Sequence, residues 1–339
     1  MSKSLITREG GMGRFATVKK AIKENPLYIV LASLCILMFI GLKFWNAYAP
    51  VSIHDWNKKE ISRIKVTDPE DINFAVFGDN KGHTIVFEPL LRDIGHNPEI
   101  VFAIDIGDLV SSGERRLFQL FLNQVQKSCA IPFLTAVGNH DVKHGDREYR
   151  EIFGPTYYGF QVGQSYFIVL DATTESGFYR EERHWLEEEL EKSQVSRVRF
   201  VFMHVPPFDP RGSGFNKCLP EKDGKDLLDL FRHYNVTHLF ASHIHGYFSG
   251  VWEGVPYTVT GGAGGRLQGS DPQHFFYHYM KVHVSNGKVE MMVRRINEGN
   301  TIAQIFDQVN YDMVELGLLV AAGILLFIPG LSAVRKHGS

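Results

Sequence analysis

The sequence predicts an α/β fold in which a largely parallel sheet packs against a second, mixed sheet, with one transmembrane helix at each end of the chain. Three observations support this prediction. Short runs rich in Phe, Val and Ile alternate with helical patterns, a stretch with stronger β character follows, and a long apolar segment lies near each terminus. Strands that alternate with helices are typical of parallel sheets.

The composition of the 339-residue chain excludes several classes of protein. A formal net charge of −2 argues against a nucleic-acid-binding protein. With 44% hydrophobic and 12% aromatic residues, the chain is too apolar to be disordered. Only two of its cysteines, Cys129 and Cys218, lie outside the long apolar segments, so the sequence holds no disulfide framework.

The first predicted element is an apolar segment at 27–45, whose only charge is Lys43. Its length suits a bilayer core of about 30 Å. A cleaved signal peptide is the rival interpretation, because the Ala-Tyr-Ala sequence at 47–49 resembles a cleavage site. An uncleaved anchor is favoured, because the segment exceeds the usual signal-peptide core, a long tail precedes it, and Pro50 would follow the cut.

Continuous apolar runs, each closed by polar residues, predict strands that are buried on both faces. These strands are expected at 72–77, 100–104, 131–137, 198–203 and 237–241. Helical patterns lie at 117–125, 181–192 and 227–231, and the charged helix at 181–192 is expected to cover the core with one apolar face. The segments with stronger β character, which predict the second sheet, are 166–170, 275–284 and 288–294.

The last predicted element is an uncharged segment at 316–334, which Arg335 and Lys336 follow at once. It predicts a second transmembrane helix. A buried C-terminal helix is a weaker alternative because the segment has no polar face. A cleaved lipid-anchor signal is also weaker, because such signals are not expected to end in a basic cap.

Basic residues beside both predicted spans place both termini in the cytoplasm and the intervening domain on the opposite side of the membrane, although Lys58 and Lys59 oppose this orientation. We expect an integral membrane protein, with a bacterial inner membrane as its location. The predicted organisation is a cytoplasmic basic tail (1–26), a transmembrane helix (27–45), a juxtamembrane linker (46–70), the extracytoplasmic domain (71–296), a second linker (297–315), a transmembrane helix (316–334) and a cytoplasmic tail (335–339).

A polar motif follows each of the five predicted parallel strands. The motifs are Gly-Asp-Asn at 78–80, Gly-Asp-Leu-Val at 107–110, Gly-Asn-His-Asp at 138–141, Met-His-Val-Pro at 203–206 and Ser-His-Ile-His-Gly at 242–246. Each motif, taken alone, is explained by a turn or a helix cap. Together, at the carboxyl ends of strands, they predict one site whose Asp, Asn and His donors suit a pair of divalent ions. Phosphoester hydrolysis is the expected use of such a pair, and Asp108 is the candidate bridging ligand.

This series resembles the calcineurin-like metallophosphoesterase family, whose ordered pattern is D-x-H, G-D-x-x, G-N-H-[DE], a lone His and G-H-x-H, over roughly residues 70 to 290. The resemblance implies a sandwich of two mixed sheets flanked by helices, with two divalent ions of manganese, iron or zinc. It implies that the first ion is held by Asp79 and His245, the second by Asn139, His204 and His243, and both by Asp108. His140 would bind the phosphoryl oxygen or protonate the leaving alkoxide, and Asp141 would orient His140.

One position departs from the family pattern, because Lys81 stands where the first motif has His. A protonated Lys cannot ligate a metal. Asn80 or His83 could substitute, the first ion could be held more loosely with added water, or Lys81 could act as a fixed cation on the substrate phosphate. We favour the last two together; the alternative is that Lys81 faces solvent without a role.

The glycine-rich run before Arg266 has two interpretations. It allows a tight bend, or it brings backbone donors and Arg266 to an anionic substrate.

The predicted function is therefore a membrane-anchored, two-metal phosphoesterase that acts on a phosphorylated substrate, with a lipid or another envelope component as the expected one. No nucleic acid is expected as a partner. A protein of another class, which keeps the fold but binds an envelope partner without catalysis, is the first alternative. A protein or nucleotide phosphatase is the second.

Overall fold

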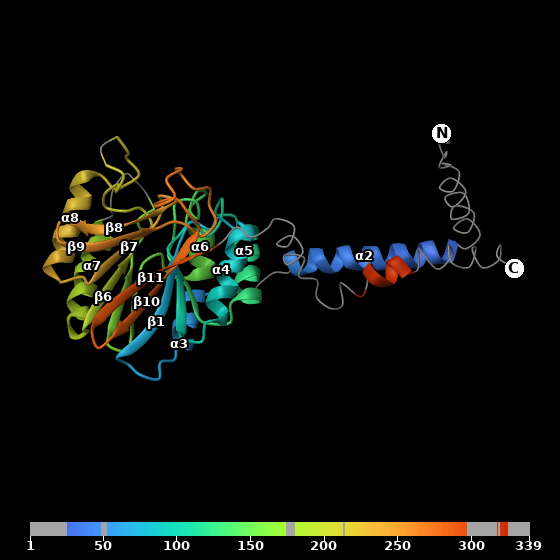
Figure 1. The fold of residues 1–339 in the computed structure, drawn as a ribbon, viewed down its shortest axis with the longest axis horizontal. Helices are drawn as coiled ribbons and strands as arrows, with labels where there is room; N and C mark the ends of the chain where they lie inside the picture. Colours follow the sequence, from blue (N-terminus) through green and yellow to red (C-terminus); the bar gives the residue numbers. More distant parts are fainter. Residues whose placement is uncertain are drawn as a thin grey trace, which may run out of the picture. The chain divides into compact units, whose positions relative to one another are not determined.

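The computed structural model describes residues 26–48, 53–173, 180–212, 214–296, 317 and 319–324. The chain divides into two compact units, one of residues Pro50–Gln308 and one of Met1–Ala49 with Val309–Ser339 (Figure 1). The predicted linker at 297–315, the tail at 335–339 and most of the predicted tail at 1–26 and of the second span at 316–334 lie outside the described residues.

Helix α2 (Pro26–Tyr48) covers the first apolar segment, and its side chains are described as far as Leu42. Several of its large apolar side chains are exposed, among them Leu27 and Leu37. Within the described residues, none of the helices combines the length and the apolar character that crossing a membrane requires.

The larger unit contains two mixed sheets. The first has the strand order β11-β10-β1-β2-β3, in which β1, β2 and β3 are parallel and β10 is antiparallel to β1 and β11. Its strands are β1 (Asp71–Phe77), β2 (Ile100–Asp105), β3 (Phe133–Thr135), β10 (His278–Ser285) and β11 (Lys288–Arg295).

The second sheet has the order β4-β5-β6-β7-β9-β8, with parallel strands in the centre and an antiparallel strand at each edge. Its strands are β4 (Tyr158–Val162), β5 (Ser165–Val169), β6 (Val198–Phe202), β7 (His238–Ala241), β8 (Tyr247–Trp252) and β9 (Val255–Thr260).

The predicted division of strands between the sheets is wrong in part. Strands β6 and β7 were expected in the first sheet but lie in the second, whereas β10 and β11 were expected in the second but lie in the first. The apolar patterns report how deeply a strand is buried and not which strand lies beside it. Strand β10, which is far from β1 in the sequence, pairs with β1 in antiparallel orientation, with Ala75 opposite Lys281.

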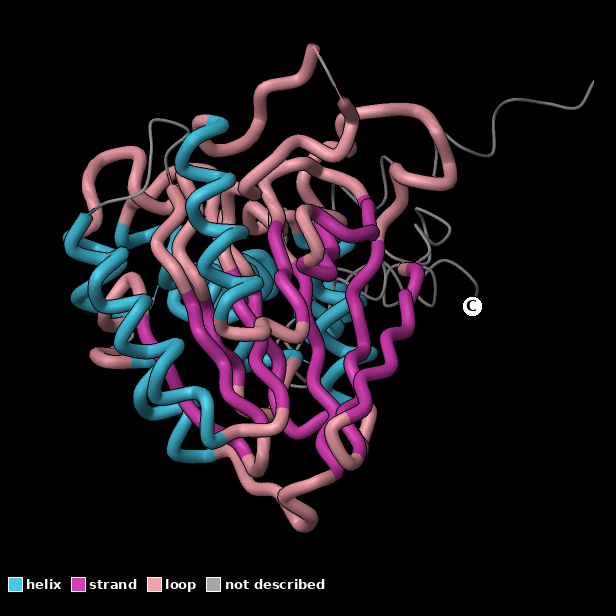
Figure 2. The backbone as a smooth tube through the Cα atoms, turned by 90° about the vertical axis from the view of Figure 1, so that its left-hand side faces the viewer, coloured by secondary structure: helices cyan, strands magenta, loops and turns pink. Residues whose placement is uncertain are grey.

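Aromatic side chains fill the space between the sheets. Phe74 of β1 stacks on Phe102 of β2, with ring centroids 5.2 Å apart, and meets Phe167 and Phe200 of the second sheet edge to face. Helices cover the outer faces, as Figure 2 shows in cyan. They are α4 (Thr84–His96), α5 (Arg115–Ser128) and α6 (Arg147–Phe153) beside the first sheet, and α7 (Arg180–Lys192) and α8 (Glu221–His233) beside the second. The predicted sandwich flanked by helices is confirmed.

A short helix, α3 (Trp56–Arg63), lies within the segment that was predicted to be a linker. It packs against β3, where the Trp56 indole N–H donates to the Phe133 carbonyl at 2.7 Å. The Asn57 amide N–H donates to the Thr135 carbonyl at 3.1 Å, and the Asn57 carbonyl oxygen accepts a hydrogen bond from the Thr135 main-chain N–H at 2.9 Å. These two bonds occupy the main-chain groups of β3 that a neighbouring strand would otherwise pair with. The folded domain therefore begins before residue 71. The sequence did not indicate this because two of the three buried residues of α3 are polar.

Candidate metal centre

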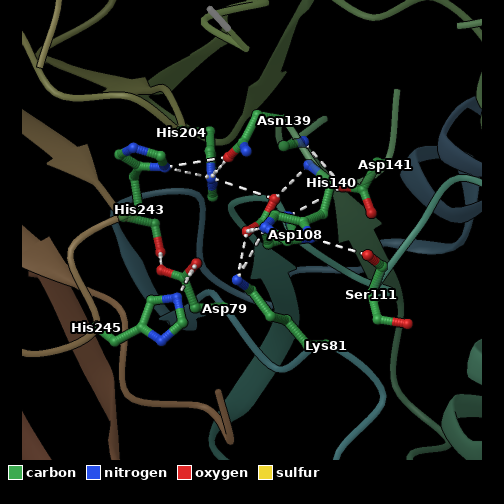
Figure 3. Close-up of polar contacts among 12 residues, drawn as sticks. Asp79, Lys81, Asp108, Ser111, Asn139, His140, Asp141, His204, His243 and His245 are labelled. Atoms are coloured by element: carbon green, nitrogen blue, oxygen red, sulfur yellow. Dashed lines mark hydrogen bonds and ion pairs between the residues drawn. The ribbon is translucent and has the colours of Figure 1, made fainter. Parts of the chain in front are cut away.

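The residues predicted to ligate metal lie together at the carboxyl ends of five strands (Figure 3). Asp79 follows β1, Asp108 follows β2 and Asn139 follows β3, whereas His204 follows β6 and the pair His243 and His245 follows β7. Both sheets thus contribute to one site, because their strand ends meet at the same edge of the sandwich.

The backbone of these loops is unusual. Asp79, Asp108 and His243 have φ values of 62°, 59° and 67°, in the left-handed region that few residues other than Gly adopt. Such conformations persist where the surrounding structure holds them and they cluster at functional sites. The loops also pack closely, since a Cβ on Gly138 would lie 2.1 Å from the Asp108 nitrogen. The Gly before Asn139 in the motif therefore has a steric cause.

One group of donors surrounds the Nε2 atom of His204, which is fully buried. This atom lies 3.1 Å from Asn139 Oδ1, 3.3 Å from His243 Nδ1 and 3.3 Å from Asp108 Oδ1. His204 Nδ1 lies 3.0 Å from the Ile106 carbonyl, to which only a protonated nitrogen can donate. Nε2 is therefore the ring nitrogen directed at the other donor atoms, and in a neutral ring it would present its lone pair to a metal ion. Lone pairs that converge in a buried site require a cation between them.

The second group contains Asp79 and His245, whose Oδ1 and Nε2 atoms are 3.2 Å apart. His245 Nδ1 donates to the Arg266 carbonyl at 2.6 Å, so Nε2 is the ring nitrogen that faces Asp79. Asp79 Oδ1 is buried without a hydrogen-bond partner among the described residues. Burial alone would raise the pKa of Asp79, but His245 and the other nearby cationic groups hold it well below its usual range. The carboxylate is therefore ionised and suited to a cation.

Asp108 joins the two groups. Its Oδ1 faces His204, and its Oδ2 points to the opposite side, toward Lys81. One oxygen each from Asp79 and Asp108 and one nitrogen from His204 lie within 4.8 Å of one another. The donor set thus fits divalent ions, and its mixture of carboxylate, amide and imidazole ligands is compatible with manganese, iron or zinc.

Lys81 points into the site. Its Nζ atom lies 3.2 Å from Asp108 Oδ2 and 3.2 Å from His140 Nε2. The alternative in which Lys81 faces solvent is therefore wrong. Asn80 does not take the place of the missing His, because its side chain bonds to Asp105 and to the Gly82 nitrogen. His83 is exposed to solvent.

His140 is oriented by a backbone carbonyl and not by Asp141 as predicted. Its Nδ1 lies 2.8 Å from the Ser111 carbonyl, and its Nε2 faces the site. The Asp141 carboxylate instead accepts the main-chain N–H groups of two motif loops, from Gly138, Asp108, Leu109 and Val110, at 2.8 to 3.3 Å. Burial and the charge of Asp108 raise the pKa of Asp141 well above its ordinary value. Sequence reasoning missed Ser111 because a carbonyl acceptor leaves no residue signature.

We expect Asp141→Ala to lower the free energy of unfolding by about 3 kcal/mol, because it leaves several buried N–H groups without an acceptor. Chemical denaturation measures this change. Asp146→Ala is the control, because among the described residues the Asp146 side chain pairs with Arg150 alone and both side chains are nearly half exposed, and it should change stability by less than about 0.5 kcal/mol. An Asp141 variant of normal stability with a large loss of kcat would instead support the predicted contact with His140.

Arg266 contributes its carbonyl to the site through His245, while its side chain is exposed. The glycine run before it approaches the first motif, where the Gly265 N–H donates to the Asp79 carbonyl at 2.6 Å. This contact supports the interpretation as a tight bend. A role of the Arg266 side chain in substrate binding stays a prediction.

Comparison with known proteins agrees with this geometry. A family model described as calcineurin-like phosphoesterase matches residues 72–247. The serine/threonine-protein phosphatase CPPED1 of Rattus norvegicus is 28% identical over 196 residues, which cover 50% of this chain and 62% of that protein. A probable cyclic nucleotide phosphodiesterase of Rhodopseudomonas palustris is 29% identical over 177 residues, which cover 49% and 64%. The chain thus spans less than two thirds of these relatives.

Solved structures share the fold. A purple acid phosphatase from yellow lupin superposes with a TM-score of 0.54 at 16% identity, covering 66% of this chain and 51% of that one. A dimetal phosphatase from Danio rerio superposes with a TM-score of 0.51 at 14% identity, covering 66% and 96%.

Proposed function

Because the chain belongs to the calcineurin-like phosphoesterase family, we propose that it is a dinuclear-metal enzyme that hydrolyses phosphomonoesters or phosphodiesters. The observation that carries this proposal is the convergence of carboxylate, amide and imidazole donor atoms around His204 Nε2 and Asp79 Oδ1. When bound, two divalent ions supply a nucleophilic water and neutralise charge on the phosphoryl group. Asp79, Asp108, Asn139, His204, His243 and His245 would hold them.

The residues around these donors have their own tasks in the proposed reaction. The Ser111 carbonyl fixes the ring of His140, so that Nε2 faces the space beside Asp108. A proton carried on that nitrogen is transferred to the leaving oxygen, or the N–H binds a phosphoryl oxygen. Lys81 and Arg266 are proposed to contribute positive charge to substrate binding.

We further propose that the enzyme is anchored in a membrane, with a bacterial inner membrane as its location, through residues 27–45 and 316–334. Both termini would lie in the cytoplasm and the catalytic domain outside it. The support is the apolar sequence of both segments and the exposure of Leu27, Leu34 and Leu37 on α2, each more than half exposed. A domain held at the bilayer meets lipid-linked phosphoesters at high local concentration. The proposed substrate is therefore a lipid phosphate or another envelope phosphoester.

The test uses the full chain in lipid nanodiscs, with manganese supplied. A phosphorylated lipid in the bilayer and a water-soluble ester with the same head group are compared by kcat/KM. The lipid is expected to react at least ~10-fold faster because of its local concentration. Equal rates would contradict the lipid assignment. Bound metal without turnover of any ester would favour a non-catalytic binding protein that retains the fold.

A protein or nucleotide phosphatase is the second candidate. It is favoured by the likeness to a serine/threonine-protein phosphatase and to a probable cyclic nucleotide phosphodiesterase, and by a cavity of about 510 Å³ that adjoins the His245 segment. Arg211, Phe215, Phe248 and Phe275 are among its lining residues, and Gln268 links it to the site by donating to the His245 carbonyl. A planar base could stack in such a lining. Faster turnover of nucleotides or of a phosphoserine peptide than of the lipid would select this candidate.

A further inference from the structure

We propose that the ammonium group of Lys81 competes with the first divalent ion for Asp108, so that the two ions bind with unequal affinity. The inference rests on the proposed two-ion site and deepens it. The first ion is the one expected between Asp79, His245 and Asp108 Oδ2, and the second is the one expected between Asp108 Oδ1, Asn139, His204 and His243.

Lys81 is fixed in the site by its backbone. Its φ value is 50°, and its N–H donates to the Asp108 carbonyl at 2.9 Å, which ties the two motif loops together. The side chain is only 22% exposed. The ammonium group therefore reaches Asp108 from a held position and is not a mobile surface charge.

The contacts of Lys81 affect the two ion positions differently. Its Nζ lies 3.2 Å from Asp108 Oδ2, the oxygen that we assign to the first position because Oδ1 faces His204 of the second group. Oδ1, which serves the second position, faces His204 and accepts the main-chain N–H of His140 at 2.9 Å. An ion at the second position keeps four protein donors. An ion at the first position keeps three protein donors and meets the positive charge of the Lys81 ammonium group.

The ammonium and the first ion cannot share Asp108 Oδ2 without strong repulsion, because like charges a few ångströms apart interact strongly in a partly buried site. Binding of the first ion must therefore displace the Lys81 head group. The nearest new partner for that group is an anionic substrate, which accounts for the predicted contact with phosphate. The first ion is then expected to bind more tightly when a phosphoester is present.

The test is calorimetric titration of the metal-free full chain with Mn²⁺. Wild type should bind two ions whose affinities differ at least ~10-fold. In Lys81→Gln and Lys81→His, the weaker affinity should rise at least ~10-fold and the tighter one should stay within about twofold. Lys59→Gln is the matched control, because it removes the same charge from the exposed face of α3, and it should leave both affinities unchanged.

Two equal affinities in wild type, or a weak site that neither Lys81 variant strengthens, would overturn the inference alone. Absence of Mn²⁺ binding, or binding that Asp108→Asn leaves intact, would instead overturn the proposed function. Inorganic phosphate provides a second readout. It should tighten the weaker event in wild type and have a smaller effect in Lys81→Gln.

Discussion

Replacing Asp108 by Asn is expected to lower kcat/KM by at least ~10³-fold and to reduce bound metal below two ions per chain. Asp108 is 1% exposed, its Oδ1 lies 3.3 Å from His204 Nε2 and its Oδ2 lies 3.2 Å from Lys81 Nζ, and it is the proposed bridging ligand. Asn keeps the shape of the side chain but replaces one oxygen with an NH₂ group that cannot ligate a metal. The change therefore removes the bridge without opening a cavity. Steady-state kinetics and metal analysis of the same preparation measure the two effects.

Asp105→Asn is the matched control for this experiment. Asp105 is also a buried carboxylate near the site, but its side chain accepts a hydrogen bond from the Asn80 amide and it does not belong to the group of Asp79, Asp108 and His204 found among the described residues. Burial and the neighbouring Asp141 and Asp79 raise the pKa of Asp105 well above its ordinary value, which favours its neutral form. A neutral Asn should therefore be tolerated, with two ions retained. An Asp108 variant that also kept two ions and near-normal turnover would refute the bridging role.

The positions of the candidate metal ligands could be predicted because each lies within a few residues of the end of a strand that the apolar pattern reveals. The expected strand at 100–104 agrees closely with β2 (Ile100–Asp105), and Asp108 follows it within one turn. The carboxyl ends of the parallel strands β1, β2, β3, β6 and β7 meet at one edge of the sandwich, although these strands belong to two sheets. The error in assigning β6 and β7 to the first sheet therefore did not move His204 or His243 away from the site.

Other features depend on contacts that no local pattern encodes. The acceptor for His140 is the carbonyl of Ser111, which any residue at that position would offer. Asp141 could have faced its sequence neighbour, yet its carboxylate accepts four main-chain N–H groups from two motif loops. The direction of Lys81, a long side chain with many rotamers, is decided by Asp108 and His140 after the loops have met.

His140→Gln is expected to lower kcat by about 10²- to 10⁴-fold for esters of alkyl alcohols, the usual range for loss of a general acid. Its Nε2 lies 3.9 Å from Asp108 Oδ2, so it is close to the reacting centre and separate from the predicted ligands. An alkoxide leaves slowly unless it is protonated, whereas a nitrophenolate needs no proton. The loss should therefore be far smaller for nitrophenyl phosphate, and metal content should not change. Turnover of the two esters by the same preparation measures this contrast.

The comparison also separates the two roles predicted for His140. A general acid produces a loss that depends on the leaving group, whereas a hydrogen bond to a phosphoryl oxygen lowers the rate of both esters equally. His144→Gln is the control, because His144 is an exposed histidine in the same loop, and it should leave both rates unchanged. Equal losses in His140→Gln would assign the residue to binding the phosphoryl oxygen. The Ser111 carbonyl would then serve to hold the ring so that Nε2, which faces the site, donates its N–H to the phosphoryl oxygen.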